Sequence, residues 1–155
     1  MLIRGATSKG AYFLATELPS SKKERDALLL STMGPPHPDQ IDGIGGCYPS
    51  RSKIAIVAKS SESGIEVDFL FAQVVVDKPF VDTSPSCGNI LSGVGPFASE
   101  RGLVKAQHGS ASVRVRTLNT NTIAELVVCT PGGAVSYRGD ARVDGGRFDR
   151  SFTTK

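Results

Sequence analysis

Short hydrophobic runs and alternating hydrophobic and polar positions occupy most of this chain, a pattern typical of β-strands. Runs rich in Val, Ile and Phe at 53–58 and 67–76 predict strands that are buried on both faces. Residues 112–118 alternate strictly, so that strand is expected to have one solvated face. Further strands are expected at 1–3, 10–16, 123–129 and 134–137, with a turn over residues 5–9 between the first two. The pattern predicts a sheet as the main element of the fold.

Two segments have apolar residues at helical spacing instead. The first has good helix formers at 22–30, a capping box of Ser21 and Glu24 at its start, and a stop at Gly34 and the two prolines after it. The residues expected to face the core are Leu28, Leu29 and Met33. The irregular stretch 35–49, rich in glycine and proline, follows as a loop.

The second helical segment begins at Cys87 and ends near Arg101, before Gly102. Gly93, Gly95 and Pro96 oppose it, because an interior glycine costs about 1 kcal/mol and an interior proline about 3 kcal/mol. Only burial would stabilise such a helix. The predicted fold is therefore α+β: a strongly curved, mostly antiparallel sheet or barrel wrapped around one central helix.

Composition and charge restrict the function. The chain has 155 residues and 16.3 kDa, the size of one domain, and its apolar runs fall short of the roughly 18 residues that cross a membrane. The net charge of +3 is weak and the basic residues are scattered, which argues against nucleic acid and is compatible with a small anion. Three cysteines without a CxxC pair favour reduced thiols, and the polar first residues lack a signal peptide, so a cytoplasmic location is expected.

No metal or nucleotide site is expected. His37, His108 and Cys47 lack ligand-like spacing. The stretch 93–98 formally fits GxGxxA, but it lies inside the helical period rather than between a strand and a helix, so the context excludes a dinucleotide loop.

The chemistry is expected at the start of the central helix. Unpaired backbone N–H groups there favour a thiolate at Cys87 and also bind a carboxylate. Gly88 lets a ligand approach the backbone, and Asn89 offers a donor and an acceptor. Taken alone, the same residues are explained by a small buried thiol and a cap. A Cys-His hydrolase using Cys87 and His108 is a further alternative, which requires those side chains within hydrogen-bond reach.

Four motifs stand in order along the chain: RGATSKG at 4–10, QIDGIGG at 40–46, SKIAIV at 52–57 and SCGNILSGVGPFA at 86–98. Together they resemble the family of 2-methylaconitate cis-trans isomerase and 4-oxalomesaconate tautomerase, which has the diaminopimelate epimerase-like fold. The resemblance runs from residue 2 to about residue 145. An amino-acid epimerase shares this fold, but the motifs outside Cys-Gly-Asn point away from it.

The resemblance implies a cofactor-independent isomerase or tautomerase that moves a proton within a small unsaturated tricarboxylate. It assigns the acid-base pair to Lys53 and Cys87, and leaves open which one takes the proton and which tricarboxylate is bound. Without the motif, Lys53 would be interpreted as a solvated strand-end lysine. The residues expected to bind the substrate are Thr7, Ser8, Lys9, Ser52, Ser86, Gly88 and Asn89.

The resemblance also implies a two-lobed protein of about twice this length, with the substrate between the lobes. We expect residues 1–145 to form the N-terminal lobe and 146–155 to be a divergent tail, with the second lobe absent. Such a chain is expected to have little activity alone and to expose an apolar lobe interface through which copies associate. The alternative is a non-catalytic remnant that binds carboxylates or a partner lobe.

Overall fold

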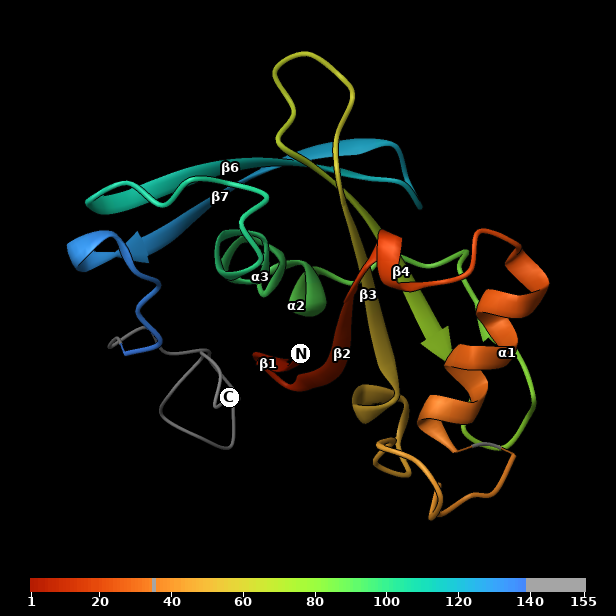
Figure 1. Ribbon diagram of the computed structural model, residues 1–155. Coiled ribbons are helices and arrows are strands. Elements are labelled where there is room, and N and C mark those ends of the chain that lie inside the picture. The colour runs from red at the N-terminus through yellow and green to blue at the C-terminus, as the bar shows by residue number, and fades with distance from the viewer. Residues whose placement is uncertain (35, 139–155) are drawn as a thin grey trace.

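The computed structural model describes residues 1–34 and 36–138, and within them one curved seven-stranded sheet forms the centre of the molecule (Figure 1). Its strands are β1 (Leu2–Gly5), β2 (Ser8–Leu14), β3 (Lys53–Lys59), β4 (Val67–Val74), β5 (Val81–Asp82), β6 (Gly109–Thr117) and β7 (Thr122–Thr130). They follow the order β1-β2-β3-β4-β6-β7, with β5 beside β4. The β2–β3 and β4–β6 pairs are parallel and the others antiparallel. The prediction of an α+β fold with a mostly antiparallel curved sheet is confirmed.

Helices cover both faces of this sheet. The α-helices are α1 (Lys22–Met33), α2 (Gly88–Leu91) and α3 (Val94–Glu100), and the 3-10 helices are η1 (Ala15–Glu17), η2 (Pro49–Arg51) and η3 (Pro131–Gly133). Helices α2 and α3 lie inside the curve of the sheet, and α1 packs on its other face (Figure 1). Within the described part of the chain, none of these helices has the length and apolar character needed to span a bilayer.

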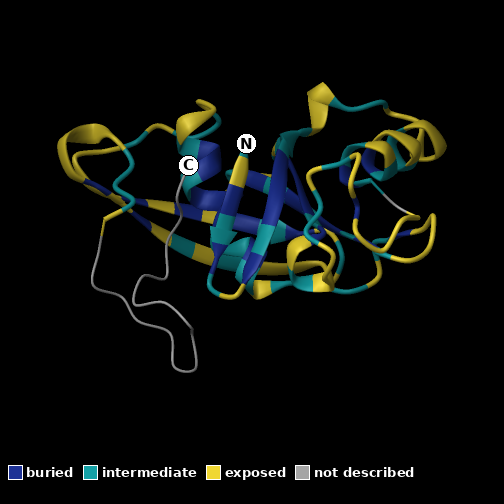
Figure 2. Ribbon diagram, turned by 90° about the horizontal axis from the view of Figure 1, so that it is seen from below, coloured by how far each residue is buried: buried dark blue, intermediate teal, exposed yellow. Residues whose placement is uncertain are grey.

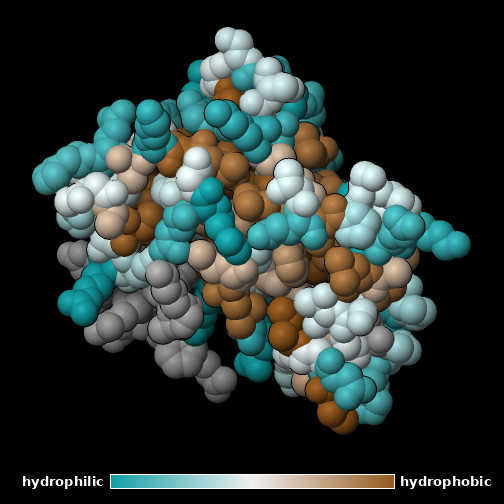
Figure 3. All heavy atoms as spheres, in the orientation of Figure 1, coloured by the Kyte–Doolittle hydropathy of each residue, from teal (hydrophilic) through white to brown (hydrophobic). Residues whose placement is uncertain are grey.

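Two hydrophobic cores result from this arrangement. In β3, Ala55 and Val57 face α2 and α3, whereas Ile54 and Ile56 face α1. This alternation confirms that β3 is buried on both faces, and Figure 2 shows the buried residues concentrated in the central strands and helices. In the space-filling view, apolar residues gather in the middle of the visible face and hydrophilic residues surround them (Figure 3).

Strand β6 confirms the prediction of one solvated face. Its burial alternates, with Val113 and Val115 buried on the side of α3. On the other side Arg116 forms an ion pair with Asp68, at 2.9 Å, and a second one with Glu62. Alternation along a strand therefore reported the burial of this segment correctly.

The predicted single central helix was wrong, because it is two helices separated by Ser92 and Gly93. The break has a packing reason. The hydroxyl of buried Tyr12 donates to the carbonyl oxygen of Ile90 at 2.5 Å, and a Cβ on Gly93 would lie 2.5 Å from that hydroxyl oxygen. Glycine at this position lets β2 approach the helix backbone and bind a carbonyl near the break.

The capping box at the first helix was also wrong. Ser21 is the N-cap of α1, but its side chain makes no capping hydrogen bond. The helix ends at Met33 and closes at Gly34, the predicted stop, in the left-handed conformation (φ 87°). Leu29 and Met33 are buried as expected, whereas Leu28 is 42% exposed, because α1 turns only one side towards the sheet.

Turn and strand boundaries differ from the predictions in two places. Only Ala6 and Thr7 lie between β1 and β2, so Ser8 and Lys9 belong to a strand. Residues 134–137 do not form a strand, because Gly132 and Gly133 have positive φ values (72° and 77°) that turn the chain after β7. The short strand β5 was not predicted. The predicted boundary between 145 and 146 lies outside the described residues.

Candidate active site

Cys87 occupies the N-cap of α2 and is partly exposed. Its backbone carbonyl accepts a hydrogen bond from the Leu91 N–H at 2.9 Å. Helix α2 has four residues, so the local N–H groups, rather than the dipole of a long helix, act on the thiol. The next residue, Gly88, is exposed, and a Cβ there would meet nothing within 4 Å, which leaves open space beside the thiol.

The core side of Cys87 faces Tyr12. Cys87 packs against the core that contains Tyr12 and Ile90. Burial, followed by the charge of an ionised Cys87, raises the pKa of Tyr12 far above its ordinary value. Tyr12 therefore stays a neutral hydrogen-bond donor to α2.

Asn89 connects α2 to the turn between β1 and β2. Its side-chain NH₂ donates to the hydroxyl oxygens of Thr7 (3.1 Å) and Ser8 (3.3 Å). On the same side, a Cβ on Gly5 would lie 1.8 Å from the Asn89 carbonyl oxygen. The close approach at Gly5 thus brings Thr7, Ser8 and Asn89 together next to Cys87.

Lys53 begins β3 and lies under the same helix. In the sheet it pairs with Gly10 of β2 and Gln73 of β4. A Cβ on Gly10 would lie 2.6 Å from the Lys53 carbonyl oxygen and 3.0 Å from Cδ1 of Ile90, so α2 sits directly over this pair. The Lys53 amine donates to Oε1 of Gln73 at 2.8 Å and lies 5.0 Å from the centre of the Phe71 ring. Lys53 and Ala55 are two residues apart on β3, so both side chains lie on the face that α2 covers.

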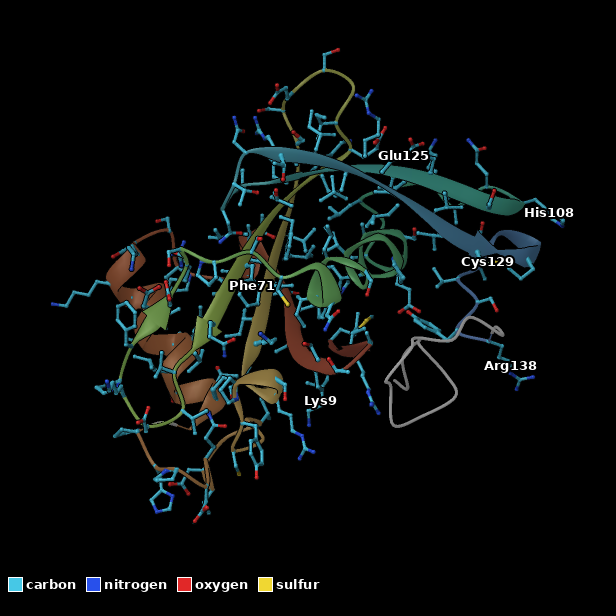
Figure 4. All side chains as sticks on the ribbon, turned by 180° about the vertical axis from the view of Figure 1, so that it is seen from behind. Lys9, Phe71, His108, Glu125, Cys129 and Arg138 are labelled. Atoms are coloured by element: carbon cyan, nitrogen blue, oxygen red, sulfur yellow. The ribbon has the colours of Figure 1, made fainter. Side chains whose placement is uncertain are left out.

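Three other predicted site residues have different surroundings. Ser52 is buried, and its hydroxyl donates to Oε1 of Gln40 at 2.7 Å, so it supports the preceding loop. Ser86 is exposed beside Cys87. Because side chains alternate along β2, Lys9 lies on the face of Ala11, opposite to the face of Ser8 and α2. Lys9 and Phe71 can be located in Figure 4.

Two residues near the site were missed in the sequence analysis. Gln73 is the polar residue within the otherwise apolar stretch 69–76, and that exception was the available signal. Asn119, in the turn between β6 and β7, gave no such signal. Its side chain accepts from the Phe71 N–H (2.8 Å) and donates to the carbonyl oxygens of Phe71 (2.9 Å) and Thr83 (2.7 Å). Asn119 therefore ties β4 to the loop that leads to Cys87.

The same loop is held a second time at Asp82. Its carboxylate accepts from the hydroxyl of Ser84 (2.6 Å) and from the Ser84 N–H (2.9 Å). These two hydrogen bonds, the hydroxyl first, hold the pKa of Asp82 below its usual range. The backbone before the thiol is thus held at two successive residues: Thr83 is bound by Asn119, and Ser84 is bound by Asp82.

Replacing Asn119 with alanine is expected to lower the free energy of unfolding by about 2 kcal/mol, because three hydrogen bonds to backbone groups are lost. Urea unfolding followed by circular dichroism measures this loss. Leu118→Ala is the matched control, since Leu118 is exposed and its loss is expected to change stability by less than about 0.5 kcal/mol. Equal stability of the two variants would show that the Asn119 contacts do not hold the loop.

The structure does not bring Cys87 and His108 together. His108 is exposed and lies at the outer end of β6, while Cys87 begins α2 at the centre of the molecule (Figures 1 and 4). The Cys-His hydrolase alternative therefore lacks its required geometry. Among residues 1–34 and 36–138, no group of three or more His, Cys, Asp or Glu side chains is placed to hold a metal ion.

Comparison with known proteins identifies similar sequences. The family model described as PrpF protein matches residues 1–152. The chain is 54% identical over 145 residues to (4E)-oxalomesaconate Delta-isomerase of Novosphingobium sp. (strain KA1), covering 94% of this chain and 41% of that protein. It is 54% identical to 4-oxalomesaconate tautomerase of Pseudomonas putida, with 94% and 40% covered. It is 42% identical to 2-methyl-aconitate isomerase of Shewanella oneidensis, with 94% and 39% covered.

The fold has a close counterpart among solved structures. The crystal structure of methylitaconate-delta-isomerase superposes with a TM-score of 0.91 at 36% identity, covering 96% of this chain and 38% of that one. The chain thus spans about 40% of the length of the relatives that it matches.

Proposed function

Because this chain belongs to the PrpF protein family, we propose that it supplies the Lys53 and Cys87 side of a cofactor-independent isomerase or tautomerase. Family membership confirms the resemblance inferred from the four motifs. The observation that carries the proposal is the placement of both groups on the concave face, with α2 lying over the strand pair that presents Lys53. We propose a small unsaturated tricarboxylate of the 2-methylaconitate or 4-oxalomesaconate type as substrate.

The proposed reaction is a proton shift without a change of oxidation state. One of the two groups takes a proton from a carbon next to a carboxylate or carbonyl, and the C–H electron pair moves into the neighbouring bond. The double bond shifts, and the other group returns a proton at the far carbon. Backbone N–H groups at Gly88 and Asn89 are suited to hold the negative charge that develops on oxygen.

The hydroxyl groups of Thr7 and Ser8 are suited to bind a carboxylate. The Asn89 NH₂ donates to both hydroxyl oxygens, so the hydroxyl hydrogens are free to point to another acceptor. We propose that they donate to a substrate carboxylate next to Cys87, with Ser86 and Gly88 lining the exposed side. Ser52 acts through the loop it supports, and Lys9, on the other face, contributes least.

We further propose that the complete active site also needs the part of the relatives' sequences that this chain does not match. A second lobe would exclude water and supply further donors to the substrate. The apolar centre of the face in Figure 3 supports this proposal, because such a surface favours a covering lobe. A cytoplasmic location and association between copies stay predictions.

The function is tested with a lobe-exchange chimera, in which this chain replaces the matching part of the Novosphingobium isomerase. The chimera is expected to isomerise 4-oxalomesaconate or 2-methylaconitate, while the chain alone is expected to stay near the background rate. Turnover is measured by ¹H NMR in D₂O. The unmodified relative is the positive control. Robust turnover by the chain alone would contradict the need for a second lobe. A folded chimera that binds tricarboxylates without turnover would instead favour the non-catalytic binding protein.

A further inference from the structure

The amine of Lys53 has a defined hydrogen-bond partner in Gln73. Lysine carries its charge on a flexible four-carbon stem, so an acid-base role requires a contact that fixes the amine. Within the described residues, the amine donates to Oε1 of Gln73 at 2.8 Å and lies over the Phe71 ring at 5.0 Å. Gln73 lies directly opposite Lys53 on β4, and Phe71 is two residues before it on the same face.

The orientation of the Gln73 amide follows from its other contacts. Its NH₂ donates to the carbonyl oxygens of Ser52 (2.9 Å) and Pro49 (3.0 Å). With both carbonyls on the NH₂ side, the amide oxygen must face the Lys53 amine, because the flipped orientation would set oxygen against oxygen. The amide is thus locked by the backbone that immediately precedes Lys53.

That backbone is itself held in place. The loop that precedes Ser52 packs around the buried side chain of Gln40. The Oε1 of Gln40 accepts hydrogen bonds from the Ser52 hydroxyl (2.7 Å) and from the Cys47 N–H (2.9 Å). On the strand side, the Val74 N–H donates to the Ser52 carbonyl oxygen at 3.0 Å. The support of Gln73 therefore comes from a buried polar group and a sheet hydrogen bond, both more rigid than a surface contact.

We propose that Gln73 is a positioning residue that aims the Lys53 amine towards the substrate side of the sheet. The proposal rests on the function proposed above, since it assigns a task to an amine that acts in proton transfer. Gln73 acts through Lys53 and accepts its hydrogen bond, and the amine also lies over the aromatic ring of Phe71.

The placement of the amine is tested by NMR on the 155-residue chain. The ring current of Phe71 is expected to shift the Lys53 ε-methylene protons upfield, and Lys53→Arg identifies their signal. Gln73→Leu, of similar size without the amide, is expected to move this signal towards the position of a solvated lysine. Gln107→Leu is the matched control, because Gln107 is exposed and outside the site. An unmoved Lys53 signal in folded Gln73→Leu would overturn the proposal.

The effect on turnover is tested in the lobe-exchange chimera. Gln73→Leu is expected to lower kcat by roughly 10- to 100-fold with little change in KM, because the amine is displaced rather than removed. Gln73→Glu keeps an oxygen acceptor for the amine but sets its second oxygen against the carbonyl oxygens of Ser52 and Pro49, so it is expected to recover only part of the kcat lost in Gln73→Leu. A displaced NMR signal with unchanged kcat would also overturn the proposal. Absence of turnover in the parent chimera would refute the proposed function, while the NMR result still decides whether Gln73 holds the amine.

Discussion

Replacing Cys87 with alanine is expected to lower the turnover of the lobe-exchange chimera by roughly 10²- to 10⁴-fold, the usual contribution of a positioned acid-base group. Lys53→Met is expected to cause a loss of the same size, because each group completes one half of the proton shift. The double variant is expected to lose little more than either single variant, since the two residues act as a unit. Steady-state kinetics with 4-oxalomesaconate measures all three.

Cys129→Ala is the matched control for the thiol. Cys129 is a free, exposed cysteine on β7, so its removal is expected to leave turnover unchanged. Cys87 is partly exposed at the N-cap of a short helix, so its replacement is also expected to leave the fold intact. Unchanged turnover in either Cys87→Ala or Lys53→Met, with the protein folded, would remove the acid-base assignment.

Gly5→Ala is expected to lower the free energy of unfolding by about 3 kcal/mol, the upper part of the range for overpacking. The added methyl would lie 1.8 Å from the Asn89 carbonyl oxygen and 2.5 Å from the Ser92 hydroxyl oxygen. Because one of these contacts is with backbone, relief requires α2 to move away from β1. The same movement would separate Asn89 from Thr7 and Ser8, so binding of a tricarboxylate should weaken as well.

Gly88→Ala is the control for this substitution. An added methyl at Gly88 meets nothing within 4 Å, so the free energy of unfolding is expected to change by less than about 1 kcal/mol. Urea unfolding compares the stability of the two variants. A calorimetric titration measures how a methyl group in the open space beside the thiol changes the affinity for a tricarboxylate. Equal stability of Gly5→Ala and Gly88→Ala would mean that β1 and α2 are not packed as closely as the structure shows.

Most strands of the central sheet, though not β5, could be predicted from the sequence because local patterns indicate their burial. Runs rich in Val, Ile and Phe marked β3 and β4, whose side chains enter two cores, and alternation marked the solvated face of β6. The candidate pair Lys53 and Cys87 was found through sequence motifs. A motif depends only on the order of residues and can be recognised without knowing their contacts. These features depend on neighbours in the chain, so one sequence is enough to state them.

Contacts between distant segments could not be read from the chain. The break in the central helix depends on Tyr12, 78 residues from the carbonyl it binds. The placement of Gln73 beside Lys53 depends on the register of two strands, and a shift of one residue would turn Gln73 to the other face. Lys9 was grouped with Ser8 by adjacency, yet the pleat of β2 separates them. Local patterns specify which residues are buried or exposed, whereas register, packing distance and the pleat decide which of them share a site.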